Sequence, residues 1–283
     1  MMRFGMEDGR PTIFTEIRNR YAVYLDNDSL IELAKGDSQR KERFVSAIRR
    51  GGALLFSLAN ALEIGGPRGA SAASVDSFLD ALGPHWAPLE LNPWAVVKRE
   101  EAGLRERAPI SEEFARAYFR QRAYELSPNG ERLLDLSENF FRLSAVAEWS
   151  RRDRCRIMQG VDSLYKEFDL ELRKARAEYE RNPALQPLKP LPFDENHPAK
   201  FATVNLLRLL VAEWKAYQFT RNDVMDFCHA VVGTSAATLA TLDRHWKRRV
   251  ESLPTPNKLA KVFYRAEIDS LVQVLEELVD KLN

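Results

Sequence analysis

The stretch Tyr21-Ala-Val-Tyr-Leu25, followed at once by Asp26-Asn-Asp-Ser29, is the most informative part of this chain. The apolar, β-prone run is too short for a helix, and it stops abruptly at acidic and amide side chains. Such a pattern is typical of a buried strand that leads into a helix. We expect Ser29 or Asp28 to cap that helix, which would begin at Leu30.

The same alternation of short apolar runs and helical patterns occurs on both sides of a long central region. Further strands are predicted over residues 53–57, 85–91, 238–242 and 261–264. Helices are predicted over residues 30–35, 40–50, 58–64, 74–82, 222–232, 244–253 and 268–282. Short apolar strands that alternate with helices indicate an α/β fold with a mostly parallel sheet covered on both faces.

The central region has a different pattern, with long helical segments rich in Arg, Glu, Ala and Leu. Breaks are expected near Pro109, at Pro128-Asn-Gly130 and over residues 182–197. We predict a three-layer α/β/α domain formed by residues 20–92 and 220–283, with a large helical insertion over residues 93–219.

Composition excludes several classes of protein. Among 283 residues, 42 are basic and 41 acidic, and the formal net charge of +1 argues against a protein that coats nucleic acid. Two cysteines and four histidines provide neither a disulfide framework nor a cysteine–histidine zinc motif. The first residues lack the apolar core of a signal peptide, and no apolar run is long enough to span a membrane. We therefore expect a cytoplasmic protein with no membrane contact.

Acidic residues follow the predicted strands at places where a parallel sheet would bring them together. Asp26 follows the first strand, Glu63 lies one turn into the helix after the second, and Asp243 follows the fourth. Ligands of such sheets bind beyond the carboxyl ends of the strands. Asp226 and His229 have the three-residue spacing of one helix face, which could point to the same edge.

A carboxylate cluster without histidine or cysteine partners suits Mg²⁺ or Mn²⁺ better than zinc. One or two such ions can activate water and stabilise the leaving oxygen in phosphodiester hydrolysis. The pattern therefore predicts a metal-dependent hydrolase that acts on a phosphate ester.

Three segments in this order resemble the PIN-like nuclease family: Tyr21 to Leu33, Ser57 to Ile64, and Asn222 to Ala230 followed by Asp243. The resemblance covers roughly residues 20–92 and 220–283. It implies a three-layer fold and hydrolysis of nucleic-acid phosphodiester bonds, usually in RNA, with Mg or Mn.

The resemblance also implies roles for individual residues. Asp26 and Glu63 match the first two metal-binding acids, Asp226 matches the third, and Asp243 matches the acid after the fourth strand. Asp223 is a candidate auxiliary ligand. Many family members have another Asp about five positions before the last acid, and Thr238 stands at that place here.

Structural interpretations compete with these roles. Asp26 and Asp223 would also serve as helix caps, and His229 as an ordinary buried histidine. Candidate substrate-binding residues are His229, His245, Lys247 and Arg248, although charged side chains after Asp243 are more often helix surface. The cluster Arg151, Arg152, Arg154 and Arg156 is a second candidate phosphate-binding face.

The sequence thus predicts an endoribonuclease in which Asp26, Glu63, Asp226 and Asp243 hold Mg or Mn. Nucleic acid, expected to be RNA, is the predicted partner. The resemblance makes a toxin with an antitoxin, another protein partner or a defence role plausible, and a homo-oligomer is compatible with the chain. Two alternatives stay open: a non-catalytic nucleic-acid or protein-binding module, and an enzyme that cleaves DNA or another phosphate ester.

Overall fold

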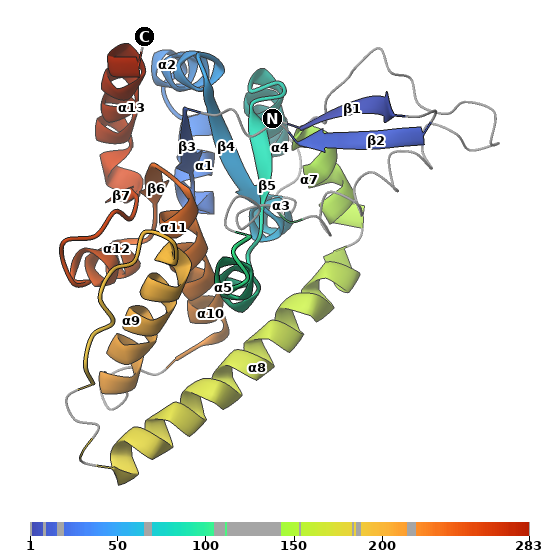
Figure 1. Ribbon diagram of the computed structural model, residues 1–283. Helices are drawn as coiled ribbons and strands as arrows, with labels where there is room; N and C mark the ends of the chain where they lie inside the picture. The colour runs from blue at the N-terminus through green and yellow to red at the C-terminus, as the bar shows by residue number, and fades with distance from the viewer. Residues whose placement is uncertain are drawn as a thin grey trace.

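The computed structural model describes residues 2–7, 10–15, 20–64, 70–104, 111, 143–152, 154–182, 184, 188–213 and 219–282. A five-stranded, all-parallel sheet is at its centre (Figure 1). Its strands are β3 (Tyr21–Tyr24), β4 (Gly52–Ser57), β5 (Trp86–Leu89), β6 (Leu239–Thr241) and β7 (Lys261–Phe263). They are arranged in the order β5-β4-β3-β6-β7. The predicted α/β class and all five predicted strands are confirmed.

Helices cover both faces of this sheet. The first face carries α1 (Asn27–Lys35), α2 (Ser38–Arg49), α3 (Leu58–Ile64), α4 (Ala70–Ala81), α7 (Leu143–Arg152) and α13 (Ile268–Leu282). The second face carries α5 (Pro93–Glu101), α9 (Pro198–Ala212), α10 (Arg221–Cys228), the π-helical turn η3 (His229–Gly233), α11 (Thr234–Ala236) and α12 (Arg244–Glu251). A short 3-10 helix, η4 (Arg265–Glu267), precedes α13.

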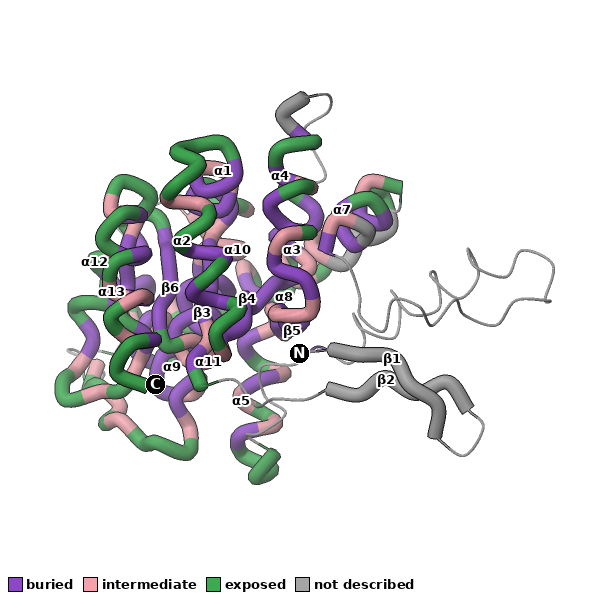
Figure 2. Tube along the Cα trace, turned by 90° about the horizontal axis from the view of Figure 1, so that it is seen from above, coloured by how far each residue is buried: buried purple, intermediate pink, exposed green. Residues whose placement is uncertain are grey.

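The alternation of side chains along each strand supplies a core on each face. Val23 and Leu54 belong to the first core, whereas their neighbours Tyr24 and Leu55 belong to the second. Figure 2 shows the buried strands at the centre and exposed residues on the outer sides of helices such as α2 and α12. The arrangement is consistent with a three-layer α/β/α fold. The apolar stripe of α13 is buried in the first core.

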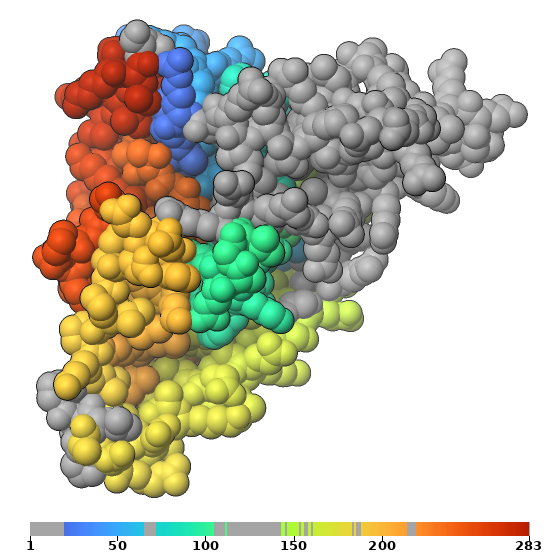
Figure 3. Space-filling model, in the orientation of Figure 1, coloured from blue at the N-terminus to red at the C-terminus, as the bar shows by residue number. Residues whose placement is uncertain are grey.

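Helices from the predicted insertion pack against this domain. The long helix α8 (Arg154–Arg181) contributes Val161 beside the first core and Phe168 to the second. Buried Glu100 of α5 accepts hydrogen bonds from the backbone N–H groups of Ala199 (2.9 Å) and Lys200 (3.0 Å), which fixes the start of α9. Figure 3 shows α5, α8 and α9 on one side of the molecule. The boundaries of the insertion stay a prediction, and the breaks expected at Pro109 and 128–130 lie outside the described residues.

Two local predictions need correction. Helix α1 begins at Asn27, with Asp26 as its cap, so neither Asp28 nor Ser29 has the predicted capping position. The side chain of Asp26 has a suitable oxygen one residue before the helix, and the chain turns earlier than the apolar pattern indicated. An antiparallel hairpin of β1 (Met2–Glu7) and β2 (Arg10–Thr15) was not predicted. The alternation of apolar Met2, Phe4 and Met6 with Arg3, Gly5 and Glu7 was a signal for its first strand. Within the described residues, no helix has the length and apolar character needed to cross a membrane.

Candidate active site: an acidic cleft

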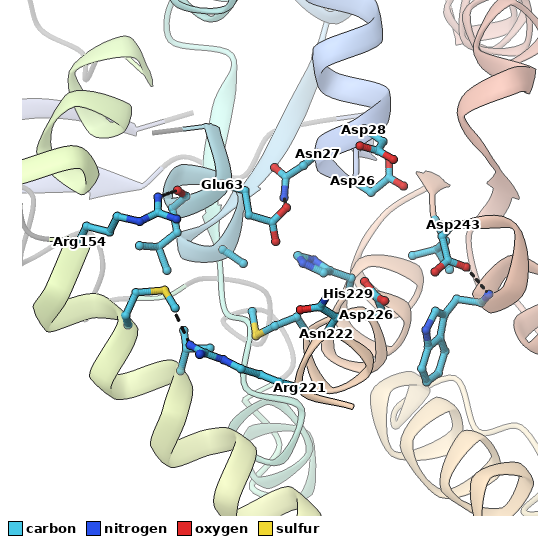
Figure 4. A pocket seen from close by; sticks show the side chains of 17 residues that line it. Asp26, Asn27, Asp28, Glu63, Arg154, Arg221, Asn222, Asp226, His229 and Asp243 are labelled. Carbon is cyan, nitrogen blue, oxygen red and sulfur yellow. Dashed lines mark hydrogen bonds between the residues drawn. The ribbon is translucent and has the colours of Figure 1, made fainter. Parts of the chain in front are cut away.

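A cleft of about 570 Å³ lies at the carboxyl ends of the central strands, between α1, α3, α8, α10 and α12 (Figure 4). We call it the acidic cleft. Its charged and polar lining residues are Asp26, Asn27, Asp28, Glu63, Arg154, Arg221, Asn222, Asp226, His229 and Asp243. All four carboxylates predicted as the main ligands therefore line one cleft. Parallel pairing of β3 with both β4 and β6 is the reason, since it aligns the carboxyl ends of all three strands.

Asp26 is both a helix cap and a residue of the cleft. Its Oδ1 accepts hydrogen bonds from the Ser29 backbone N–H (3.0 Å) and from the Thr241 hydroxyl (2.9 Å). The Thr241 hydroxyl oxygen also accepts from the Asp26 backbone N–H (2.8 Å), so the carboxylate is held across the β3–β6 junction. Burial raises the pKa of Asp26, and the hydrogen bond from Ser29 opposes that shift.

Asp243 has the same arrangement at the end of β6. It caps α12 and accepts a hydrogen bond from the Trp246 backbone N–H on Oδ1 (2.8 Å). Within the described part of the chain, no hydrogen bond reaches Oδ2 of either Asp26 or Asp243. Each cap therefore leaves one carboxylate oxygen available to a ligand in the cleft.

Glu63 is held by a polar network that connects α3 with the start of α1. Its Oε2 accepts a hydrogen bond from the Asn27 amide, and Asn27 Oδ1 accepts from the Asn60 amide (3.2 Å). Asn60 also donates to the Leu25 carbonyl oxygen (3.1 Å) and accepts from the Ser57 hydroxyl (2.9 Å). The cleft walls desolvate Glu63 and raise its pKa.

Asp226 is the most perturbed carboxyl group of the cleft. It projects from α10, and burial raises its pKa to about 7, with further contributions from the negative charges of Asp243, Asp223, Glu63 and Asp26. Mutual repulsion of this kind is relieved when a cation binds among the carboxylates. The electrostatics of the cleft therefore favour a positively charged ligand.

Other predicted site residues lie outside the cleft lining. Asp223 forms a capping box with Thr220: its Oδ2 accepts from the Thr220 backbone N–H (2.7 Å), and its own N–H donates to the Thr220 hydroxyl (3.4 Å). Thr238 bridges β3 and β6, because its hydroxyl accepts from the Ala22 N–H (3.2 Å). Both residues therefore have structural contacts, and neither lines the cleft.

The basic residues after Asp243 are also absent from the lining. Lys247 forms an ion pair with Glu267 and lies over the ring of Tyr264. His245 and Arg248 are exposed on α12. Of the predicted substrate-binding set, only His229 faces the cleft.

The positive charge of the cleft comes from α8 and α10. Arg154 donates to the Leu62 carbonyl oxygen (2.6 Å), and Arg221 forms an ion pair with Asp162 of α8 (2.7 Å). From the predicted arginine cluster, Arg151 pairs instead with Asp76 (3.0 Å) and Arg152 with Glu148. The side chain of Arg156 lies outside the described residues.

Sequence reasoning missed the residues that position the acids. A signal for Asn60 was present, because Asn60 and Glu63 are three residues apart on one side of α3, and Ser57 precedes Asn60 by the same spacing at the end of β4. Thr241 also had a signal, as a polar residue at the end of an apolar strand. Arg221 had none, since its place depends on how α8 packs.

The carboxylates of the acidic cleft fit a hydrated cation that prefers oxygen ligands. Among the described residues, no three His, Cys, Asp or Glu side chains are grouped closely enough to hold one ion by themselves. Mg²⁺ is usually bound through one or two carboxylates, retained water and substrate phosphate. Asp26, Glu63, Asp226 and Asp243 are the residues that would provide those carboxylates.

Comparison of the chain with protein-family models, curated proteins and solved structures gives no match. The geometry and chemistry of the acidic cleft are therefore the basis for assigning a function.

Proposed function

We propose that this protein hydrolyses phosphodiester bonds of nucleic acid with Mg²⁺ or Mn²⁺, as an endoribonuclease of the PIN-like type. The observation that carries the proposal is the gathering of Asp26, Glu63, Asp226 and Asp243 in one cleft at the carboxyl ends of the sheet. The raised pKa of Asp226, about 7, supports a site that is completed by a cation.

The acidic residues of the cleft and their hydrogen-bond partners would have different roles in this reaction. Asp26 and Asp243 each offer a carboxylate oxygen that the helix cap does not use, and Thr241 keeps Asp26 in place. Asn27 orients Glu63 in the same way. A bound divalent ion would activate water and offset the charge on the phosphate. Because hydrogen bonds already hold these carboxylates in place, the site needs little reorganisation when the reaction occurs.

Arg154 and Arg221 complement the acids, since a phosphodiester is an anion that needs positive charge nearby. Arg221 already has the Asp162 carboxylate as a partner, whereas no carboxylate of the described residues forms an ion pair with Arg154. Arg154 is thus the better candidate for direct contact with a substrate phosphate.

Arg154→Gln should raise KM for a labelled RNA oligonucleotide about three- to tenfold with little change in kcat. It should also reduce the slope of log affinity against log salt by about 1, because one phosphate contact is lost. Arg173→Gln is the control, since Arg173 lies exposed on the same helix and pairs locally with Asp169. An unchanged KM and salt slope in Arg154→Gln would remove this residue from the binding surface.

Asp223→Ala should lower the free energy of unfolding by about 1 kcal/mol, because the capping box of α10 is lost. Cleavage should stay within about twofold of the wild type, since the residue does not line the cleft. Urea denaturation and initial cleavage rates measure the two effects. Loss of cleavage by a folded Asp223→Ala variant would instead identify Asp223 as an auxiliary ligand.

The direct test is cleavage of labelled single-stranded RNA and DNA by the purified full chain with Mg²⁺, Mn²⁺ or EDTA. The proposal predicts cutting that needs the metal and is faster on RNA. Metal-dependent cutting of DNA alone would support a phosphodiester hydrolase whose substrate is DNA and not RNA. Absence of cutting in every condition would overturn the proposal.

A second candidate is a binding module on the same fold. The lack of a ready three-residue metal set among the described residues favours it, as does Thr238 at the place of a family Asp. It predicts RNA binding that is unaffected by EDTA and produces no fragments. Electrophoretic mobility shifts run beside the cleavage assay distinguish the two candidates.

A further inference from the structure

A π-helical turn, η3, directly follows α10 at the wall of the acidic cleft. It covers His229 to Gly233, and all five of its residues are buried. Turns of this kind are rare and occur frequently at functional sites. Here the first residue of the turn is His229, the histidine that lines the cleft.

Tyr24, the last residue of β3, is the partner of that histidine. Its side chain is fully buried, and its hydroxyl is hydrogen-bonded to Nδ1 of His229. The two rings are stacked, with centroids 5.6 Å apart and an angle of 28° between their planes. A Cβ atom at Gly233 would lie 2.5 Å from the Tyr24 ring, so only glycine allows η3 to approach β3 this closely.

The contact with Tyr24 leaves two possible tautomers of His229, because the hydroxyl can donate to Nδ1 or accept from it. Burial lowers the pKa of His229 to about 4, so the ring is neutral and carries one proton. Where the Tyr24 hydroxyl donates to Nδ1, that proton is on Nε2.

The ring of His229 is placed so that a proton on Nε2 can be donated to a ligand in the cleft. In Figure 4 the imidazole of His229 points into the cleft among the carboxylates of Asp26, Glu63 and Asp226. Within the described part of the chain, no group accepts a hydrogen bond from Nε2. In the tautomer with Nδ1 accepting from Tyr24 and Nε2 protonated, the ring has no lone pair for a metal and is a neutral hydrogen-bond donor to the cleft.

We propose that Tyr24 is a positioning residue that holds His229 in the Nε2–H form, and that this N–H donates to a phosphoryl oxygen of the bound substrate. The inference rests on the proposed function for the identity of the substrate. A neutral donor can contact a phosphoryl oxygen without competing with the cation for the carboxylates. His229 thereby becomes a catalytic residue, and Tyr24 acts through it.

The first experiment measures the tautomer of His229 by ¹⁵N NMR of the histidine-labelled full chain. The four histidines give four ring systems, and the set lost in His229→Gln identifies His229. The expected pattern is protonated Nε2 and unprotonated Nδ1. Tyr24→Phe should convert it to a mixture of tautomers.

Tyr21→Phe is the matched control for that experiment. Tyr21 lies in the same strand, is also buried, and donates to the Ala47 carbonyl oxygen (2.5 Å) on the other side of the sheet. It should leave the His229 signals unchanged. An Nδ1–H form in the wild type, or an unchanged tautomer in Tyr24→Phe, would overturn the positioning role.

The second experiment tests the contact with phosphate. Gln places its amide N–H near the position of Nε2, whereas Asn reaches only as far as Nδ1. We therefore expect His229→Asn to lower kcat about 100-fold, as loss of one donor to an oxyanion does, and His229→Gln to lower it less than about tenfold. Equal losses in the two variants would overturn the role of Nε2–H.

Titration with inorganic phosphate in the presence of Mg²⁺ separates this inference from the proposed function. The Nε2 signal of His229 should shift in the wild type and in Tyr21→Phe, even if the protein cleaves no nucleic acid. A phosphate-dependent shift without cleavage would leave the donor role standing and reject the nuclease. Cleavage with no shift of the Nε2 signal at saturating phosphate would reject the donor role.

Discussion

Asp26→Asn and Asp243→Asn should each reduce metal-dependent cleavage by about 100-fold or more, while both variants stay folded. The reason lies in the double role of these residues. Each carboxylate caps a helix with Oδ1 and leaves Oδ2 to the cleft. Asparagine is as good a cap as aspartate, so the helix is preserved. It removes the negative charge that a divalent cation requires.

Asp37→Asn is the control that isolates the charge in the cleft. Asp37 also caps a helix, accepting from the Arg40 N–H (2.7 Å), but it is exposed and does not line the cleft. Initial rates with Mn²⁺, circular dichroism and calorimetric titration of Mn²⁺ should be compared for all three variants. Cleavage by Asp26→Asn and Asp243→Asn at the rate of Asp37→Asn would show that these carboxylates do not support the reaction.

The strands were predictable because a parallel sheet covered on both faces needs continuous apolar runs. Every residue of β4 is buried, and its sequence contains no charged residue. The convergence of Asp26 and Asp243 followed from the same logic, since parallel strands end at one edge. Prediction of the fold class and of the location of the cleft therefore needed only local sequence patterns and the rule that parallel strands end at the same edge of the sheet.

The contacts that position the acids depend on packing between distant segments, which no local pattern contains. Tyr24 and His229 are 205 residues apart in the chain, and Thr241 and Asp26 are 215 apart. The π-helical turn depends on the close approach of Gly233 to Tyr24. Sequence spacing indicated a face shared by Asp226 and His229, and both residues line the cleft, but that spacing contains no information about the contact of His229 with Tyr24.

The sequence predicts either a helix cap or a metal ligand at Asp26, and the structure shows that Asp26 caps α1. Because the cap uses only Oδ1, the same carboxylate can also bind a ligand through Oδ2. For Asp223 the structure shows a capping contact, and the residue does not line the cleft. The two residues differ in position: Asp26 follows a strand at the ligand-binding edge, whereas Asp223 is not among the residues of α10 that line the cleft.

Asp226→Asn should make the metal-free protein more stable than the wild type at pH 8. The folded-state pKa of Asp226 is about 7, above the ordinary value of 3.8 for an unfolded chain. Between these values the folded wild type binds more protons than the unfolded chain, so its stability falls as pH rises from about 4 to about 7. Asparagine does not titrate and avoids this loss. We expect a gain of about 2 kcal/mol, a value discounted from the full shift because the side chain is partly exposed.

With bound divalent metal, the wild type should be more stable than Asp226→Asn. Mn²⁺ favours the charged carboxylate, so it should raise the Tm of the wild type more at pH 8 than at pH 5, where protons compete for Asp226. Asp226→Asn should show a smaller increase at both values. Denaturant titrations from pH 4 to 8, with Mn²⁺ or with EDTA, measure both effects. The same pH dependence in the wild type and Asp226→Asn, unaffected by Mn²⁺, would mean that charge repulsion in the cleft is not relieved by a cation at Asp226.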